Sequence, residues 1–177
     1  PIYTAADSAD IWAAPEEFQL DKDLNPTEVA GCPPDGFSAD GQLWGNPLFH
    51  WERMKQDGFS WWIRRIAYQF ERYDVLRIDH FRGCDAYYAI PASAKNAQNG
   101  RWRPGPGIDF FRTLEKALGK RNIIAEDLGF LTDSVHQLLK DTGYPGMKVL
   151  EFAFDSRDGG GSNYLPHHYP ENCIAYI

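Results

Sequence analysis

The stretch Val75-Leu76-Arg77-Ile78-Asp79 ends an apolar run on a carboxylate, and Ile123-Ile124-Ala125-Glu126 does the same further along the chain. Short apolar runs of this kind predict buried strands. Segments with helical periodicity lie between the runs, so strands and helices are expected to alternate. This alternation predicts an α/β fold with a parallel sheet, in which both carboxylates lie at the carboxyl ends of their strands.

The segments around these strands extend the same pattern. Residues 60–73 place apolar side chains on one stripe of a helix and arginines opposite, and Asp109 and Thr132 are expected to cap two further helices. Gly119 and Gly143 are expected to end those helices. The expected helices cover residues 50–56, 60–73, 109–118 and 133–142, and the expected strands cover 1–5, 75–79, 86–90, 123–126, 149–154 and 173–177. Residues 15–48 and 91–107, which are rich in Pro and Gly, are expected to form loops.

Two architectures combine a parallel sheet with helices: the doubly wound sheet and the (β/α) barrel. A doubly wound sheet usually carries a Gly-rich phosphate turn after a strand, whereas His80-Phe81 and Asp127-Leu128 follow the two strands here. Acidic residues at converging strand ends are typical of a barrel active site. Because a full barrel takes about 250 residues, we interpret residues 1–177 as a fragment of a (β/α)8 TIM barrel, a partial catalytic domain truncated at both ends.

Composition and charge narrow the function classes. The chain has 177 residues, of which 43% are hydrophobic and 24% charged, as in an ordinary folded domain. With 18 Lys and Arg against 25 Asp and Glu, the net charge is −7, which argues against nucleic acid as a partner. No apolar run is long enough for a membrane span. The three cysteines, Cys32, Cys84 and Cys173, are odd in number and widely spaced, so we expect no disulfide framework, no zinc site and a reducing compartment. The pair His167-His168 has no further ligands near it in the sequence, so we expect no metal there either.

Asp79 and Glu126 are the candidate catalytic residues. Glycoside chemistry needs two carboxylates that flank the scissile bond, one as nucleophile and one as acid. Arg77 stands two residues before Asp79, so both side chains point to the same side of the strand, where the guanidinium would stabilise the carboxylate. The alternative is that both carboxylates cap helices or form ion pairs at strand ends. His80 could contact a substrate or be a structural residue.

The segment Gly41-Gln42-Leu43-Trp44-Gly45-Asn46-Pro47 combines an aromatic side chain with amides between glycines. Aromatic faces stack on sugar rings and amides bind hydroxyl groups, so Gln42, Trp44 and Asn46 are candidate sugar contacts. The alternative is that Trp44 folds back over the core as a loop anchor.

Five ordered motifs resemble those of a known family. They are Val29–Ser38, Gly41–Pro47, Leu76–Gly83, Ile124–Gly129 and Pro145–Leu150. In sequence and spacing they resemble the 4-alpha-glucanotransferases, the amylomaltases or disproportionating enzymes of glycoside hydrolase family 77 in the alpha-amylase clan. The resemblance runs along essentially the whole chain, and it implies a (β/α) barrel that transfers alpha-1,4-glucan segments with retention.

The resemblance also implies roles for individual residues. Asp79 matches the nucleophile, Glu126 the general acid/base and Arg77 the arginine beside the nucleophile. Gln42, Trp44 and Asn46 match the mobile loop that covers the donor sugar. His80 and Asp127 match neighbours of the catalytic pair. The family's third acid lies in a Gly-Thr-His-Asp motif expected beyond Ile177, and another Asp is expected before Pro-Ile-Tyr. Gly36 replaces an aromatic residue that is common in the family's Pro-Pro-Asp-Tyr-Phe-Ser version.

The function hypothesis is therefore a 4-alpha-glucanotransferase that acts by double displacement on malto-oligosaccharides, amylose or starch, with no cofactor. Two alternatives stay open: a hydrolase of the same clan, in which water replaces the sugar acceptor, and a non-catalytic glucan-binding protein. The expected location is the cytoplasm, or the plastid of a plant or alga.

Overall fold

The chain folds into a mixed α/β structure with two kinds of sheet, which the computed structural model describes for residues 2–36, 38–129, 131–154 and 161–177. The five α-helices in these residues are α1 (Ala9–Ala13), α2 (Trp51–Gln56), α3 (Ser60–Phe70), α4 (Gly107–Leu118) and α5 (Asp133–Thr142). The eight strands described are β1 (Glu28–Cys32), β2 (Gln42–Pro47), β3 (Leu76–Ile78), β4 (Ala86–Pro91), β5 (Arg101–Pro104), β6 (Ile123–Ala125), β7 (Gly146–Val149) and β8 (Cys173–Tyr176).

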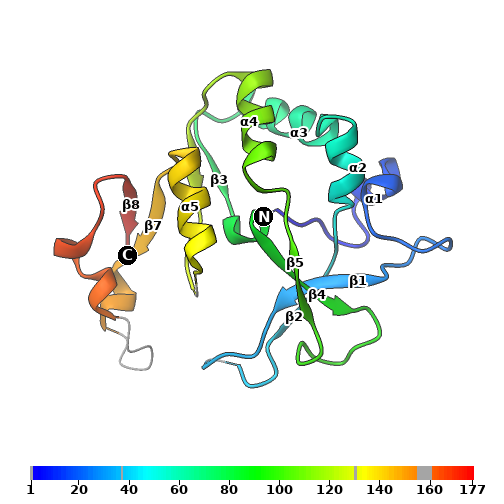
Figure 1. Cartoon of the computed structure of the whole chain (residues 1–177), viewed down its shortest axis with the longest axis horizontal. Coiled ribbons are helices and arrows are strands. Elements are labelled where there is room, and N and C mark those ends of the chain that lie inside the picture. The colour runs from blue at the N-terminus through cyan, green and yellow to red at the C-terminus, as the bar shows by residue number, and fades with distance from the viewer. Residues whose placement is uncertain (1, 37, 130, 155–160) are drawn as a thin grey trace.

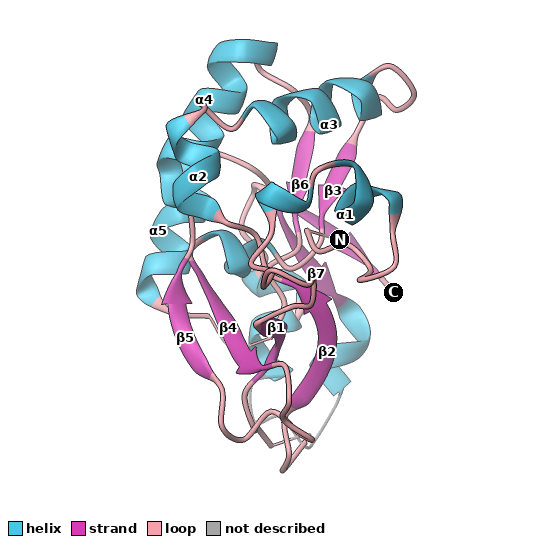
Figure 2. Ribbon diagram, turned by 90° about the vertical axis from the view of Figure 1, so that its right-hand side faces the viewer, coloured by secondary structure: helices cyan, strands magenta, loops and turns pink. Residues whose placement is uncertain are grey.

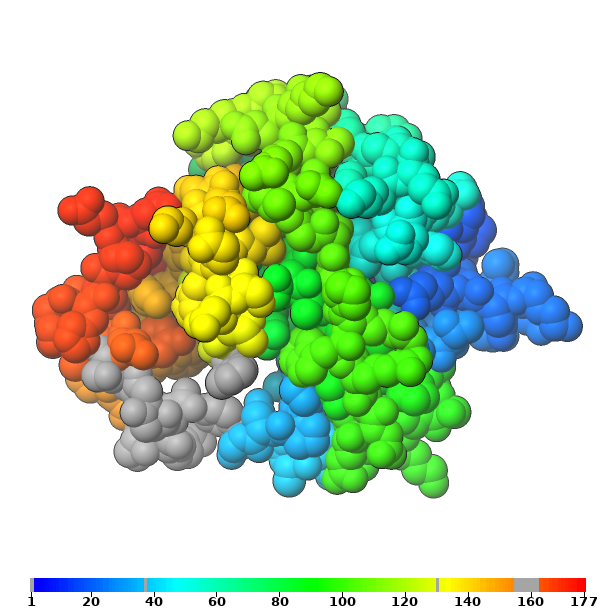
Figure 3. Space-filling view, viewed as in Figure 1, coloured from blue at the N-terminus to red at the C-terminus, as the bar shows by residue number. Residues whose placement is uncertain are grey.

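The parallel strands form two two-stranded sheets, β3-β6 and β7-β8. β3 pairs with β6 and β7 pairs with β8, both in parallel. The Ala125 backbone N–H donates to the Pro145 carbonyl at 2.9 Å, which joins β6 to the start of β7. Helix α4 precedes β6 and helix α5 lies between β6 and β7, so this part alternates strand and helix as the sequence predicted. Figure 1 shows β7 and β8 side by side, as their pairing requires. Figure 3 shows the C-terminal residues, in red, at one edge of the molecule.

The second sheet is antiparallel, in the order β2-β1-β4-β5. Figure 2 shows it below the helices α2, α3 and α4 and apart from β3 and β6. The expectation of loops over residues 15–48 and 91–107 was therefore wrong, since β1, β2 and β5 lie there. Residues 86–90 form a strand as predicted, but β4 belongs to the antiparallel sheet. The loop expectation failed because β2 and β5 are largely exposed and so lack a periodic apolar signal.

Other expectations about local structure were confirmed or corrected. Helix α5 begins after Thr132, and Gly119 and Gly143 end their helices with positive φ. Helix α4 starts at Gly107, after Pro106 as N-cap, and the Asp109 carboxylate instead pairs with Lys55 at 2.8 Å. β7 covers 146–149, and residues 150–154 form a 3₁₀ helix rather than a strand. Residues 2–5 form no strand, although Ile2, Tyr3 and Thr4 are buried, and Pro1 lies outside the described residues.

An aromatic core holds the helices, β3 and β6 and the antiparallel sheet together. Phe49 lies at its centre, 1% exposed, with ring centroids of neighbouring aromatic residues at 5.0–6.4 Å. From α4 and α5, the same cluster includes Phe110, Phe111, Leu114 and Leu138, which cover β3 and β6 through Ile78, Ile123 and Ala125. This packing fixes the strand ends that carry the candidate site.

Candidate active site

Asp79 and Glu126 lie next to each other at the carboxyl ends of β3 and β6. Ile78 is the register partner of Ala125, and the next residue on each strand is the carboxylate. The Glu126 backbone N–H donates to the Ile78 carbonyl at 2.9 Å, and the Glu126 carbonyl accepts from Phe81 N–H at 3.1 Å. The ladder therefore continues past the two strands and holds both carboxylates at one edge of the sheet.

Arg77 lies beside Asp79, as the alternation of side chains along β3 predicted. Its Nη2 donates to Asp79 Oδ1 at 2.6 Å, and its Nη1 lies 3.9 Å from the sulfur of Met147. The Asp79 side chain is 39% exposed, so it can be reached from solvent while the guanidinium holds one of its oxygens.

Glu126 is held by backbone groups at both oxygens. Oε2 accepts from the His80 N–H at 2.7 Å, and Oε1 accepts from the Leu128 N–H at 2.8 Å. These bonds fix the half-buried carboxylate in one orientation. They also match the alternative in which a strand-end carboxylate caps backbone groups, so Glu126 has a structural contact whatever its chemistry.

His80 connects the two carboxylates. It follows Asp79 directly, and its φ of 56° lies in the left-handed region, which non-glycine residues rarely adopt. Burial of the imidazole, aided by the nearby Arg82 and opposed by Asp79, lowers the pKa of His80 to about 4. The ring is therefore neutral at neutral pH, and its buried Nε2 has no hydrogen-bond partner among the described residues.

Trp44 stands on an irregular part of β2. Gly31 pairs with Leu43 and Val29 with Pro47, so residues 44–46 of β2 lie opposite Ala30 alone. Extra residues on one strand form a bulge, which turns a side chain away from its regular direction. The Trp44 ring meets the His80 ring edge-on with centroids 4.8 Å apart.

The amides around Trp44 hold this bulge. Trp44 Nε1 donates to Gln42 Oε1 at 3.0 Å, and Asn46 Nδ2 donates to the Thr4 carbonyl at 2.9 Å. Trp44 remains 37% exposed while its ring packs against Tyr3 and His80, so its contact with a sugar stays a prediction beside the alternative of a loop anchor. The structure thus brings Trp44 to His80, which follows Asp79 in the chain.

A family model for glycoside hydrolase family 77, described as 4-alpha-glucanotransferase, matches residues 1–177. The chain belongs to this family. The 4-alpha-glucanotransferase of Clostridium butyricum is 49% identical over 99% of this chain, which covers 36% of that protein. The chloroplastic/amyloplastic 4-alpha-glucanotransferase of Solanum tuberosum is 48% identical over 99% of this chain and 30% of its own length. The chain thus spans about a third of the length of these family 77 relatives.

Solved structures support the same fold for this family 77 chain. An amylomaltase from Streptococcus agalactiae in complex with acarbose superposes with a TM-score of 0.94 at 48% identity, and the match covers 99% of this chain and 35% of that one. An amylomaltase from Corynebacterium glutamicum has a TM-score of 0.70 at 23% identity, over 84% of this chain and 20% of its own, and shows the fold alone.

Asp127 lies deeper than the other predicted site residues of this family 77 chain. Its side chain is 8% exposed, and Oδ1 accepts from the Met147 N–H at 2.6 Å. A Cβ at Gly146 would lie 2.5 Å from Asp127 Oδ2, so glycine is needed for this close approach. Asp127 thus ties β6 to β7, and a contact between Asp127 and a sugar stays a prediction.

Sequence reasoning missed the contribution of residues 2–4. Tyr3 lies against both Trp44 and His80, and Thr4 accepts the Asn46 hydrogen bond. A residue more than 40 positions away has no local signal that announces such a contact.

In the described part of the chain, no helix is long and apolar enough to cross a membrane. Nor does any group of three His, Cys, Asp or Glu there suit a metal ion.

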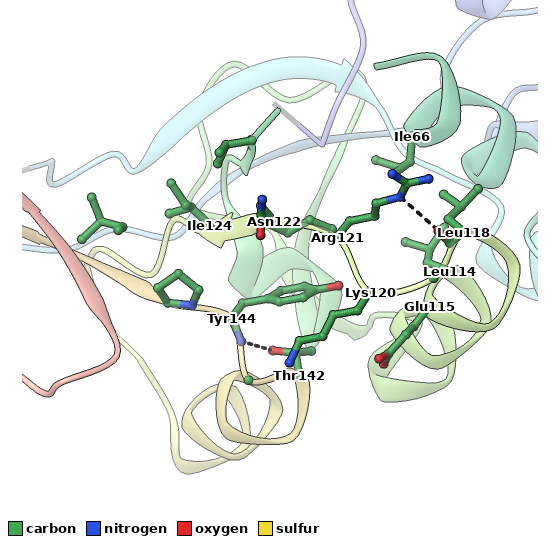
Figure 4. Close-up of a pocket in the computed structure, with 16 residues that line it drawn as sticks. Ile66, Leu114, Glu115, Leu118, Lys120, Arg121, Asn122, Ile124, Thr142 and Tyr144 are labelled. Atoms are coloured by element: carbon green, nitrogen blue, oxygen red, sulfur yellow. Dashed lines mark hydrogen bonds between the residues drawn. The ribbon is translucent and has the colours of Figure 1, made fainter. Parts of the chain in front are cut away.

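A cavity of about 360 Å³ lies away from these residues (Figure 4). Asn122 and Pro145, which precede β6 and β7, line it together with Tyr144, Leu118 and Ile174. It therefore opens at the amino ends of the strands, the end opposite to Asp79 and Glu126. In parallel α/β sheets the chemistry lies at the carboxyl ends, so this cavity is not the candidate active site.

Proposed function

We propose that the chain is part of the catalytic (β/α)8 barrel of a 4-alpha-glucanotransferase that acts on malto-oligosaccharides, amylose or starch. The observation that carries the proposal is the pair Asp79 and Glu126, one residue past the register pair Ile78 and Ala125 at the carboxyl ends of two parallel strands. Its substrate class rests on the family and on the structural relative solved with acarbose. The cytoplasmic location of the protein stays a prediction.

In the first step, Asp79 attacks the anomeric carbon of the donor glucan. Arg77 Nη2 engages Asp79 Oδ1, so we assign the attack to Oδ2. Glu126 donates a proton to the glycosidic oxygen, and the leaving glucan departs with that proton. Each Glu126 oxygen accepts one backbone N–H and has a second lone pair, which is where the proton would reside.

In the second step, an acceptor glucan displaces Asp79. Glu126, now a carboxylate, takes the proton from the acceptor 4-hydroxyl, whose oxygen attacks the anomeric carbon and releases Asp79. Two inversions give overall retention. For this mechanism we expect the two carboxyl groups to lie about 5 to 5.5 Å apart. The family's third acid, expected beyond Ile177, would support the same transition state.

Water and a sugar hydroxyl compete for the glucosyl-enzyme, so product analysis tests the proposal. Full-length enzyme is incubated with maltotriose and the products are separated by chromatography. A ladder of longer and shorter glucans supports transfer, whereas glucose and maltose alone would make the protein a hydrolase of the same clan. Unchanged maltotriose with measurable binding would make it a glucan-binding protein.

A further inference from the structure

Tyr3 is a buried aromatic residue that the proposed mechanism does not use. Its side chain is 7% exposed, and burial raises the pKa of its phenol well above the usual value, so the ring carries no charge. Its next neighbour Thr4 is 5% exposed and accepts the Asn46 hydrogen bond at 2.9 Å. Residues 3 and 4 thus touch the Trp44 bulge from a distant part of the chain.

The Tyr3 ring lies among three other rings. Its centroid is 6.3 Å from Trp44 and 6.0 Å from His80, and it stacks on Phe49 at 6.4 Å with an interplanar angle of 15°. Aromatic pairs at these separations attract one another. Since Phe49 belongs to the aromatic core, Tyr3 is the ring that links this core to Trp44 and His80.

The space around this cluster is tightly filled. A Cβ at Gly83 would lie 2.6 Å from Ile2 Cδ1, 2.9 Å from His80 Cδ2 and 3.4 Å from the Tyr3 hydroxyl. Gly83 and Tyr3 thus both pack close to the His80 ring. Because the His80 N–H binds Glu126 Oε2, a displaced ring would also disturb the proposed acid.

From these contacts we propose that Tyr3 is a positioning residue that holds Trp44 and His80 in place and thereby favours sugar over water as the acceptor. The proposal rests on the proposed function. Tyr3 acts through packing: it keeps the Trp44 indole over the site, where a bound sugar and the indole exclude water. Loss of the ring lets the bulge relax and admits water to the glucosyl-enzyme.

The test compares Tyr3→Leu with a matched core variant in the full-length enzyme. Phe18 is 3% exposed and packs on Phe49 at 5.0 Å, but among the described ring pairs it contacts neither Trp44 nor His80. Phe18→Leu should therefore lower the melting temperature by about as much as Tyr3→Leu does. It should leave the ratio of transfer to hydrolysis on maltotriose unchanged. Tyr3→Leu should lower that ratio by about tenfold, since small misplacements have large kinetic effects. Tyr3→Phe, which keeps the ring, should restore it.

Several outcomes overturn the proposal. One is an equal change of the ratio in Tyr3→Leu and Phe18→Leu, which would make the effect one of general stability. Another is a ratio of transfer to hydrolysis in Tyr3→Phe that is as low as in Tyr3→Leu, which would assign the effect to the hydroxyl. In a Trp44→Ala background, Tyr3→Leu should change the ratio by less than it does in the wild type, and a fully additive effect would contradict action through Trp44. If Tyr3→Leu does not fold, Tyr3→Met replaces it, because methionine fills irregular space. If the wild-type enzyme does not convert maltotriose into glucans longer than maltotriose, the proposed function is wrong, and this inference is wrong with it.

Discussion

The parallel strands β3 and β6 and the antiparallel strand β2 bring different chemistry to one site. β3 and β6 present Asp79 and Glu126 from a regular ladder, where backbone pairing fixes the position of each carboxylate. β2 presents Trp44 from a bulge in which residues 44–46 lie opposite Ala30 alone, and the side chains of Gln42 and Asn46 make hydrogen bonds that hold it. The two residues to which we assign bond making and bond breaking thus follow regular strands, and the residue to which we assign covering the sugar stands on an irregular one.

This difference predicts unequal consequences of mutation. A change in the parallel part should remove chemistry while the fold persists. A change at the junction around His80 should show in stability, and a change on β2 should alter how well the reaction is shielded from water. Three predictions, in order of decreasing expected effect, test this division.

The largest effect is expected for Asp79→Ala in the full-length enzyme. Removal of the proposed nucleophile leaves no group to form the glucosyl-enzyme, so initial rates of maltotriose disproportionation should fall on the order of 10⁴-fold or more. Asp74→Ala is the matched control, since Asp74 is exposed just before β3 and uses its backbone carbonyl to bind Asn122. An Asp79→Ala enzyme within about tenfold of wild type would remove Asp79 from this role.

Most of the parallel part was predictable because its signals are local, although β7 was expected at residues 149–154 and lies at Gly146–Val149. An apolar run that ends on an acid, a helix that begins after Thr132 and helices that end at Gly119 and Gly143 can all be read over a few residues. The adjacency of Asp79 and Glu126 then follows from parallel pairing. The barrel itself stays a prediction, since the described residues show two parallel strand pairs, β3-β6 and β7-β8, joined by the hydrogen bond from Ala125 to Pro145.

Of the antiparallel strands, β4 was predicted and β1, β2 and β5 were missed, for physical reasons in the case of β2 and β5. Strand β2 is exposed along most of its length and interrupted by the bulge, so no alternation of period two survives in its sequence. β5 is exposed at three of its four residues. The contact of Tyr3 with Trp44 and His80 joins segments about 40 and 80 residues apart, and only folding brings them together.

An intermediate effect is expected from His80 as the pH falls. Burial of the ring lowers the pKa of His80 from 6.5 to about 4, with Arg82 aiding the shift and Asp79 opposing it. Between these values the unfolded chain binds a proton at this position and the folded chain does not, so stability falls as the pH drops below about 6.5. From pH 7 to pH 5 this contribution amounts to about 2 kcal/mol.

His80→Asn tests this expectation, because asparagine does not titrate and tolerates the left-handed conformation of residue 80. Urea unfolding of the full-length protein at pH 7 and pH 5 should show a smaller loss of stability for the variant than for wild type. Equal losses would mean that the imidazole is accessible to protons in the folded state.

The smallest effect is expected for Trp44→Ala, and it separates shielding from chemistry most sharply. Trp44 does not touch the bond that breaks in the proposed mechanism; it contributes an exposed ring face beside His80. Loss of the stacking contact between the indole and a sugar ring should lower the rate of transfer by about tenfold. Water admitted to the glucosyl-enzyme should raise the share of glucose and maltose among the products. Trp12→Ala is the matched control, since Trp12 lies on α1 and is 74% exposed. If Trp44→Ala slows the enzyme but leaves the product ratio of wild type, β2 binds sugar without controlling the acceptor. The irregular strand would then serve affinity alone, and the division between the two regions would lie in binding rather than in the exclusion of water.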